Sequence, residues 1–207
     1  MRIKEYDRKD VLEYAKKWAY LRNPNYYNFD NLGGDCTNFA SQCIYSGSKV
    51  MNYETNIGWY YINVKDRAPA WTGVEYLYNF LIKNKKVGPF GHEVQNEKIE
   101  IGDLIQLSFS NNIYSHSLIV VGREKDEIYV ATHTYDTFYR KVSSYSYEKI
   151  RKIHIDGVRS WWNLEKAIDI YIKNCYYNKS LRPVGQAVKT PPSQGGIMGS
   201  IPVRVTK

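Results

Sequence analysis

One cysteine of this chain stands where a thiol could act as a nucleophile. Cys36 follows two glycines and an aspartate and precedes the polar pair Thr37-Asn38, so a loop presents it rather than an apolar segment. An apolar stripe that begins at Phe39 predicts that Cys36 opens a helix. The positive end of a helix and its unpaired backbone N–H groups favour the thiolate over the thiol. For a cysteine taken alone, the competing interpretation is a small buried side chain.

The other two cysteines are better explained as core side chains. Cys43 lies on the apolar stripe that follows Cys36, and Cys175 lies in a second apolar pattern near the C-terminus. Cys36 and Cys43 would be about 10 Å apart along the helix axis, which excludes a disulfide between them. Three cysteines without a Cys-x-x-Cys spacing also argue against a disulfide framework and against a zinc knuckle.

Two of the four histidines are placed where they could serve a nucleophile. His116 begins an apolar strand after a polar loop, which holds its backbone while its ring faces a cleft, as a general base requires. His133 lies near the end of the next predicted strand and could orient His116 if the two strands pair. A hydrogen-bonded structural role is the alternative for each ring, and it is the only role that we expect for His92 and His154.

Other catalytic chemistries find less support in the sequence. Cys36, His116 and His133 could be considered as zinc ligands, but no two of them have a close metal-ligand spacing and a fourth ligand is missing. We therefore expect no metal and no other cofactor. The acidic residues are scattered, with no marked pair for glycoside hydrolysis.

Helices are expected to come first in the chain. One is predicted from Arg8 to Arg22, with Asp7 as its cap and an Asn-Pro pair after its end. The helix that begins at Cys36 has Asp35 as its expected cap and ends near residues 46–47. A third helix follows a capping-box pattern at residues 72–75.

Strands are expected to follow the helices. Period-two patterns predict them at residues 104–107, 116–121, 128–134 and 152–155, and the short turns between them indicate antiparallel neighbours. The order predicts an α+β fold, with N-terminal helices packed on a small antiparallel sheet.

The motifs that surround these residues resemble a known family. The blocks that carry the resemblance are residues 23–26 (NPNY), 33–42 (GGDCTNFASQ), 71–72 (WT), 102–104 (GDL), 115–120 (SHSLIV) and 133–136 (HTYD). Together they are similar to the putative amidase domain family, which is regarded as a papain-like branch near the NlpC and CHAP cell-wall hydrolases. The resemblance covers about Tyr6 to Val158. Its most specific block is the one around Cys36.

The resemblance implies a papain-like fold and a set of catalytic roles. By it, Cys36 is the nucleophile, His116 the base and His133 the third polar residue, with Asp136 as the alternative for that third role. The implied reaction is hydrolysis of an amide bond through a thioester. Peptidoglycan stem or cross-bridge peptides are the leading substrate, with other peptides and amides behind them.

The resemblance also suggests residues that contact the substrate. Asp35 could bind a substrate amine in addition to capping the helix, and Trp71 and Ser115 are expected substrate contacts. The backbone N–H of Cys36 is the expected first donor of an oxyanion hole.

The C-terminal part of the chain differs from this body. We expect a papain-like domain over residues 1–160, an amphipathic helix over 161–179 and an extended basic tail over 180–207. The chain carries 29 Lys and Arg against 21 Asp and Glu, a net charge of +8. The tail contributes four cations and no acid: Arg182, Lys189, Arg204 and Lys207. It also holds four of the seven prolines, so it cannot bury enough apolar area to fold alone.

This charge favours anionic partners, and the tail could attach the protein to an anionic cell-wall polymer or a protein partner. We expect no nucleic-acid partner, because acids interrupt the basic stretches of the body and no recognition motif is present. No apolar run is long enough to span a membrane, and the first residues lack the apolar core of a signal peptide. The competing class is a non-catalytic module in which a groove lined by some of the 20 tyrosines binds sugars or peptides.

Overall fold

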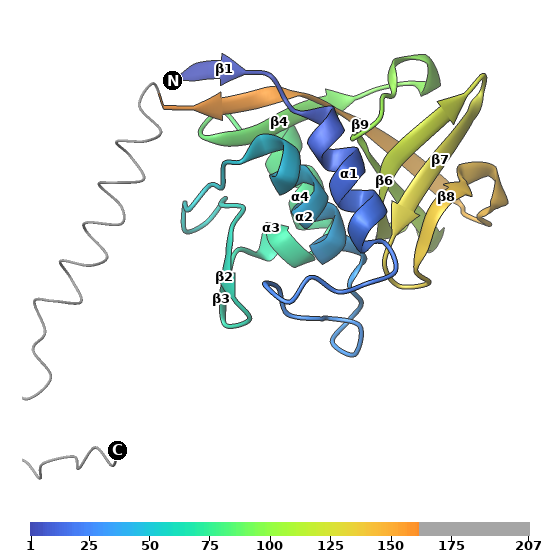
Figure 1. Ribbon diagram of the computed structural model, residues 1–207, viewed down its shortest axis with the longest axis horizontal. Helices are drawn as coiled ribbons and strands as arrows, with labels where there is room; N and C mark the ends of the chain where they lie inside the picture. Colours follow the sequence, from blue (N-terminus) through green and yellow to red (C-terminus); the bar gives the residue numbers. More distant parts are fainter. Residues whose placement is uncertain (162–207) are drawn as a thin grey trace, which may run out of the picture. The chain divides into compact units, whose positions relative to one another are not determined.

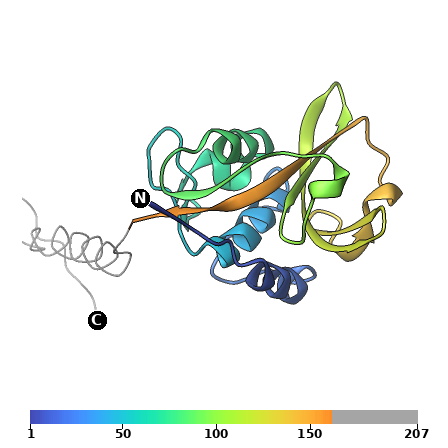
Figure 2. The same cartoon turned by 90° about the horizontal axis from the view of Figure 1, so that it is seen from above.

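A seven-stranded antiparallel sheet forms the frame of the computed structural model, which describes residues 1–161. The strand order is β1-β9-β5-β6-β7-β8, and β4 pairs with β9 as well. Figure 2 shows β9 running along the length of the described domain. The strands are β1 (Arg2–Lys4), β4 (Gly88–Glu93), β5 (Leu104–Ser110), β6 (Ile113–Glu124), β7 (Glu127–Thr132), β8 (Thr137–Lys141) and β9 (Lys149–Ser160).

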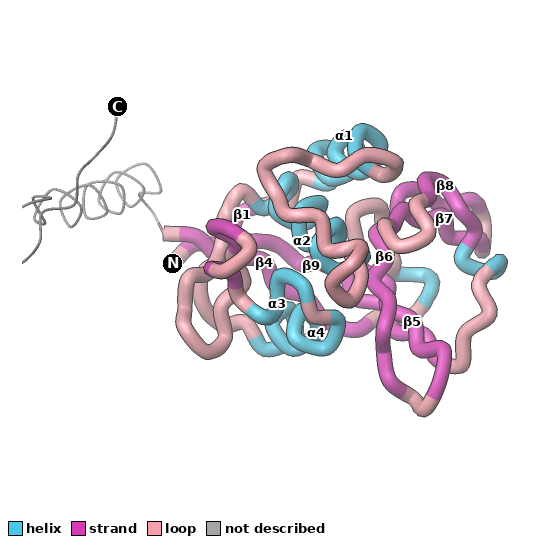
Figure 3. The backbone as a smooth tube through the Cα atoms, turned by 90° about the horizontal axis from the view of Figure 1, so that it is seen from below, coloured by secondary structure: helices cyan, strands magenta, loops and turns pink. Residues whose placement is uncertain are grey.

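Four helices precede most of the sheet in the chain. They are α1 (Arg8–Trp18), α2 (Cys36–Ser48), α3 (Pro69–Thr72) and α4 (Val74–Lys83), with a small hairpin of β2 (Tyr61–Asn63) and β3 (Asp66–Arg67) before α3. Short 3-10 turns, η1 (Asn96–Lys98) and η2 (Val142–Ser144), flank the strands. Figures 1 and 3 show α2 between α1 on one side and α3 and α4 on the other. Nearly every residue of α2 is buried as a result.

The first helix begins where the sequence predicts and ends earlier. The Asp7 carboxylate accepts the Asp10 N–H at 2.9 Å and so caps α1. The helix stops at Trp18 rather than at the predicted Arg22. Its end is fixed by tertiary contacts, because the Trp18 carbonyl accepts a hydrogen bond from His133 as well as one from the Leu21 N–H.

The two faces of the sheet have different partners. Gln106 and Ser117 lie on the face that meets the helices: the Gln106 side chain donates to the Val74 carbonyl at the start of α4, and Ser117 contacts Thr37 of α2. Side chains alternate between faces along a strand. The opposite, inner face carries an apolar cluster made of Ile99, Ile105, Leu107, Leu118, Val120, Ile128, Val130 and Val142.

The predicted order of helices before an antiparallel sheet is confirmed, and all four predicted strands are present. Asp35 is the N-cap residue of α2, as predicted, but two expected side-chain capping bonds are absent. Asp35 precedes α2 but its side chain makes no capping bond, and α4 begins after Gly73 without the predicted contact from Thr72. Among the described residues, no helix is long and apolar enough to cross a membrane. Apart from Trp161, the predicted C-terminal helix (161–179) and basic tail (180–207) lie outside the residues described.

Close packing of α1 on α2 depends on Gly47. A Cβ placed there would lie 2.6 Å from the Asp7 carbonyl oxygen and 2.6 Å from a Val11 methyl group. Gly47→Ala should therefore lower the free energy of unfolding by about 1–3 kcal/mol, measured by urea denaturation. The exposed Glu13→Ala on α1 serves as the control and should change it by less than about 0.5 kcal/mol. Equal stability of the two variants would contradict the packing described here.

Candidate active site

The Cys36 thiol lies at the N-terminus of α2, against strand β6. Its sulfur is 3.8 Å from the Thr37 hydroxyl, and the backbone N–H groups of Ser117 and Thr37 favour its thiolate form. The side chain is nevertheless buried, with 6% of its surface exposed. Burial raises the pKa of the Cys36 thiol, and these donors only partly oppose the rise. The predicted helix start is confirmed, whereas burial of the thiol acts against the thiolate that we expected the helix end to favour.

His116 lies on β6 directly before Ser117. Its antiparallel partner is Leu107, a member of the inner apolar cluster, so the His116 ring also lies on the inner face. The ring contacts Phe109 and Tyr145, with ring centroids 6.1 and 6.3 Å away. Burial and the nearby Arg140 cation lower the pKa of His116 to about 4.

The start of α2, where the Cys36 thiol lies, is thus next to the part of β6 that carries His116. The two side chains are nevertheless not paired with each other. Thr37, the residue after Cys36, is hydrogen-bonded to the Ser117 hydroxyl, with the two oxygens 3.0 Å apart, on the face of the sheet that meets the helices. The His116 ring points to the inner face, and within the described residues it makes no hydrogen bond to Cys36. At neutral pH both groups are uncharged, a thiol beside an imidazole.

His133 is turned toward the helices and away from His116. Its Nδ1 lies 2.5 Å from the Asp35 carboxylate and its Nε2 donates to the Trp18 carbonyl at 2.8 Å. The ring stacks on Phe39 with centroids 4.1 Å apart and is 1% exposed. Both ring nitrogens are therefore occupied, and His133 does not orient His116 in this structure.

Both oxygens of the Asp35 carboxylate also have hydrogen-bond partners within the protein. One carboxylate oxygen accepts the Phe29 N–H at 2.8 Å and the Asn38 side-chain amide at 2.9 Å. The other meets His133 and lies 3.7 Å from the Arg22 guanidinium. The side chain is fully buried. It therefore has no free oxygen for the substrate amine that we expected it to bind.

Asp136, the alternative third residue, is also held elsewhere. Arg22 donates to both of its oxygens at 2.9 Å and binds Asp30 as well. Burial alone would raise the pKa of Asp136, but the hydrogen bonds and charge of Arg22 lower it. Within the described residues it makes no hydrogen bond to His116.

The two expected substrate contacts differ from each other. Trp71 is fully buried, stacks on Tyr26 at 5.7 Å and donates its indole N–H to Asn38 at 2.9 Å. It supports the loop and helix around Cys36 and has no exposed surface in this structure. Ser115 is exposed on β6, next to His116, and remains a candidate contact.

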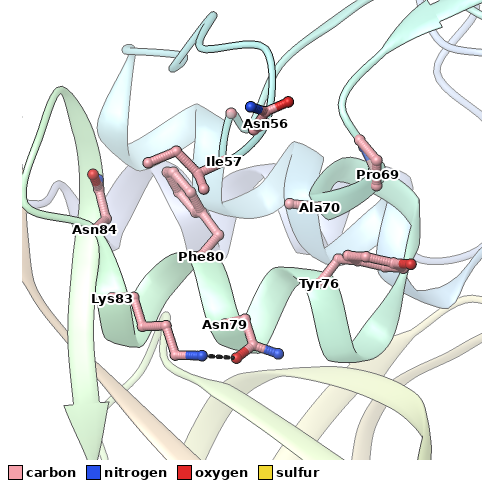
Figure 4. Close-up of a pocket in the computed structure, with 10 residues that line it drawn as sticks. Asn56, Ile57, Pro69, Ala70, Tyr76, Asn79, Phe80, Lys83 and Asn84 are labelled. Atoms are coloured by element: carbon pink, nitrogen blue, oxygen red, sulfur yellow. Dashed lines mark hydrogen bonds between the residues drawn. The ribbon is translucent and has the colours of Figure 1, made fainter.

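A cavity of about 210 Å³ lies elsewhere, between α4 and the loop at residues 56–58. Figure 4 shows Ile57 and Phe80 facing each other across it, with Lys83 bound to Asn79 at its rim. Neither Cys36 nor His116 lines this cavity, so it is separate from the site built around α2 and β6.

Comparison with known proteins agrees with these motifs. The sequence model of the putative amidase domain matches residues 5–156. The chain belongs to this family. It is also similar to the uncharacterized protein YhbB of Bacillus subtilis, with 32% identity over 149 residues, which cover 70% of this chain and 45% of YhbB. The match thus spans less than half of that protein. No solved structure matches the chain.

The buried Asp35–His133 pair should be essential to the stability of this amidase domain. Removing the His133 ring takes a hydrogen-bond donor from the buried Asp35 carboxylate and leaves a cavity beside Phe39, at a cost of about 3–5 kcal/mol. His133→Ala should lower the free energy of unfolding by that amount in urea denaturation.

His92 provides a matched control, since its ring pairs with Asp156 at 2.9 Å but its side chain is 55% exposed. His92→Ala should cost less than about 1 kcal/mol. If the two alanine variants are equally stable, the buried pair does not have the role assigned to it.

The raised pKa of the Cys36 thiol gives a second prediction for the amidase domain. Alkylation of Cys36 by iodoacetamide, followed by peptide mass spectrometry, should be slow at pH 7 and accelerate as pH rises. The inflection should lie above about 8.5, the value of a free cysteine, because the folded site disfavours the thiolate. An inflection well below pH 7 would show an activated thiolate and contradict the burial argument.

Proposed function

We propose that this protein is a cysteine-dependent amide hydrolase with a papain-like, NlpC/CHAP-type site. One observation carries the proposal: α2 begins at Cys36, and its second residue, Thr37, is hydrogen-bonded to Ser117, the residue that follows His116, with the two hydroxyl oxygens 3.0 Å apart. Membership of the amidase domain family supports amide hydrolysis. In this proposal Cys36 is the nucleophile and His116 the base.

The reaction needs a rotation of the His116 ring toward the thiol. Hydrogen bonds between catalytic groups are often absent or long before substrate binds. His116 then accepts the thiol proton while the sulfur attacks the amide carbonyl carbon. The same proton passes to the departing amine as the C–N bond breaks, which leaves a thioester on Cys36. Water, deprotonated by His116, hydrolyses the thioester and restores the thiol.

Backbone groups at the start of α2 supply the proposed oxyanion site. The first N–H groups of a helix have no intrahelical acceptor. The N–H of Cys36 is the first of these in α2 and is the proposed first donor to the developing oxyanion. The proposal assigns the third role to neither His133 nor Asp136, since both side chains are engaged elsewhere.

The proposed substrates are peptidoglycan stem or cross-bridge peptides, and other peptides after them. The family resemblance supports this class of amide. The four cations predicted for the tail would favour retention on an anionic cell-wall polymer. No nucleic acid or cofactor is part of the proposal.

Activity measurements on single variants test the assignment. Cys36→Ala should abolish amine release from cell-wall peptides, and His116→Ala should lower kcat/KM by at least about 100-fold, because each removes a group that takes part in bond breaking. Cys43→Ala is the matched control: this cysteine is fully buried on the same helix and should be dispensable for chemistry.

Turnover by Cys36→Ala at the parental rate would show that the nucleophile is misassigned. Binding of the peptides by the native protein without any cleavage would favour the non-catalytic binding module instead.

A further inference from the structure

Arg140, on β8, carries a charge that no acid of the described chain neutralises. Its Nε donates to the Ser144 hydroxyl at 2.9 Å and its Nη2 to the Ser144 carbonyl at 3.4 Å. The guanidinium lies 3.9 Å over the ring of Tyr145. Within residues 1–161 no carboxylate pairs with it, although other arginines such as Arg8 and Arg22 do have acidic partners. One edge of this half-buried guanidinium therefore remains available.

Tyr145 supplies a second unused donor beside it. Its hydroxyl oxygen is buried and has no hydrogen-bond partner of good geometry among the described residues. Burial raises the pKa of Tyr145, while the charge of Arg140 and hydrogen bonding from its guanidinium to the Tyr145 oxygen oppose the rise, which leaves the Tyr145 O–H proton free to be donated. A buried polar group without a partner is costly in a folded protein, so the unmet hydrogen bond of Tyr145 calls for a partner such as a bound molecule or ion.

Both donors lie on the same face of the sheet as His116. Arg140 is the antiparallel partner of Val130, which belongs to the inner apolar cluster, and the Tyr145 ring lies 6.3 Å from the His116 ring. The elements packed against His116 contribute few charges. Strand β5 presents the uncharged Leu107 and Phe109, and His133 faces Asp35 on the other side. Arg140 is thus the cation that acts on His116.

We propose that Arg140 and Tyr145 form a carboxylate-binding subsite beside His116, so that the protein selects peptides with a free carboxylate near the scissile amide. A guanidinium with an unpaired edge and a hydroxyl donor suit a carboxylate, which accepts two hydrogen bonds side by side. The selection of peptides for cleavage rests on the proposed function. The binding of a carboxylate by Arg140 and Tyr145 does not.

Binding at this subsite also changes the base. The Arg140 cation disfavours protonation of His116, so a carboxylate that neutralises Arg140 raises the pKa of His116 toward the range in which it accepts the thiol proton. By linkage, protonation of His116 strengthens carboxylate binding in turn. Substrate recognition and activation of the base are therefore coupled through one guanidinium.

The first test measures the His116 pKa by NMR in trifluoroacetate and in chloride at equal concentration, because trifluoroacetate stays ionised through the titration. The pKa should rise in trifluoroacetate. In Arg140→Gln it should be higher from the start and no longer respond to the anion. Arg123→Gln is the control, since Arg123 lies at the far end of β6 and binds the backbone carbonyls of Glu97 and Ile99. This variant should behave like the native protein.

The second test compares binding of N-acetyl-alanyl-alanine and its carboxamide to Cys36→Ala, which cannot turn either over. The free carboxylate should bind about tenfold more tightly, as expected for one charge-assisted hydrogen-bonding pair. Arg140→Gln should abolish that preference, and Tyr145→Phe, which keeps the ring, should reduce it.

No response of His116 to trifluoroacetate, the same response in Arg140→Gln, or no preference for the free carboxylate overturns the subsite. These readouts need no catalysis. A protein that binds carboxylates as described but never cleaves amides would refute the proposed function and leave the subsite standing.

Discussion

The buried contact between Asp35 and His133 is the interaction on which the arrangement of the site depends. It joins four segments: His133 reaches the end of α1 through the Trp18 carbonyl, and Asp35 binds the backbone of Phe29 and the side chain of Asn38 in α2. Thr134 adds a bond to the Asp35 N–H from a left-handed backbone position, with φ at 61°. Because Cys36 is the next residue, these bonds fix the position of the thiol against β6.

A balance between burial and charge sets the resting state of the proposed nucleophile and base. Donors surround the Cys36 sulfur, yet burial dominates and favours the neutral thiol. Burial and Arg140 likewise favour the neutral imidazole of His116. In the proposed mechanism the proton moves after a substrate neutralises Arg140 and turns the His116 ring.

Local patterns in the sequence predicted the parts of this arrangement that depend on local physics. Two glycines before a polar turn and an apolar stripe placed Cys36 at a helix start, and alternating apolar residues placed His116 on a strand next to the strand that leads to His133. The direction of each ring could not be predicted in this way, because it depends on which face of the sheet meets the helices. His133 faces the helices and binds Asp35, whereas His116 faces the inner cluster.

Residues outside any clear pattern were missed for a related reason. β8 is short, and none of its residues is fully buried. Its sequence therefore shows no alternation of apolar and polar residues from which the position of Arg140 could be predicted. Tyr145 follows a single 3-10 turn, η2, which comes directly after β8. Its ring comes near the His116 ring of β6 only in the folded sheet, so no local pattern predicts this contact. Trp71 looked like a substrate contact because it belongs to a family motif, but its indole completes the aromatic packing behind Asn38.

The formation of a thioester on Cys36 is the central claim, and intact-protein mass spectrometry after rapid acid quenching tests it most directly. The protein would be mixed with peptidoglycan stem peptides and quenched before turnover is complete. The account predicts an acyl adduct of the expected mass that maps to Cys36 and is absent from Cys36→Ala. Cleavage of the peptides without any adduct on Cys36, or with an adduct on another residue, would contradict it.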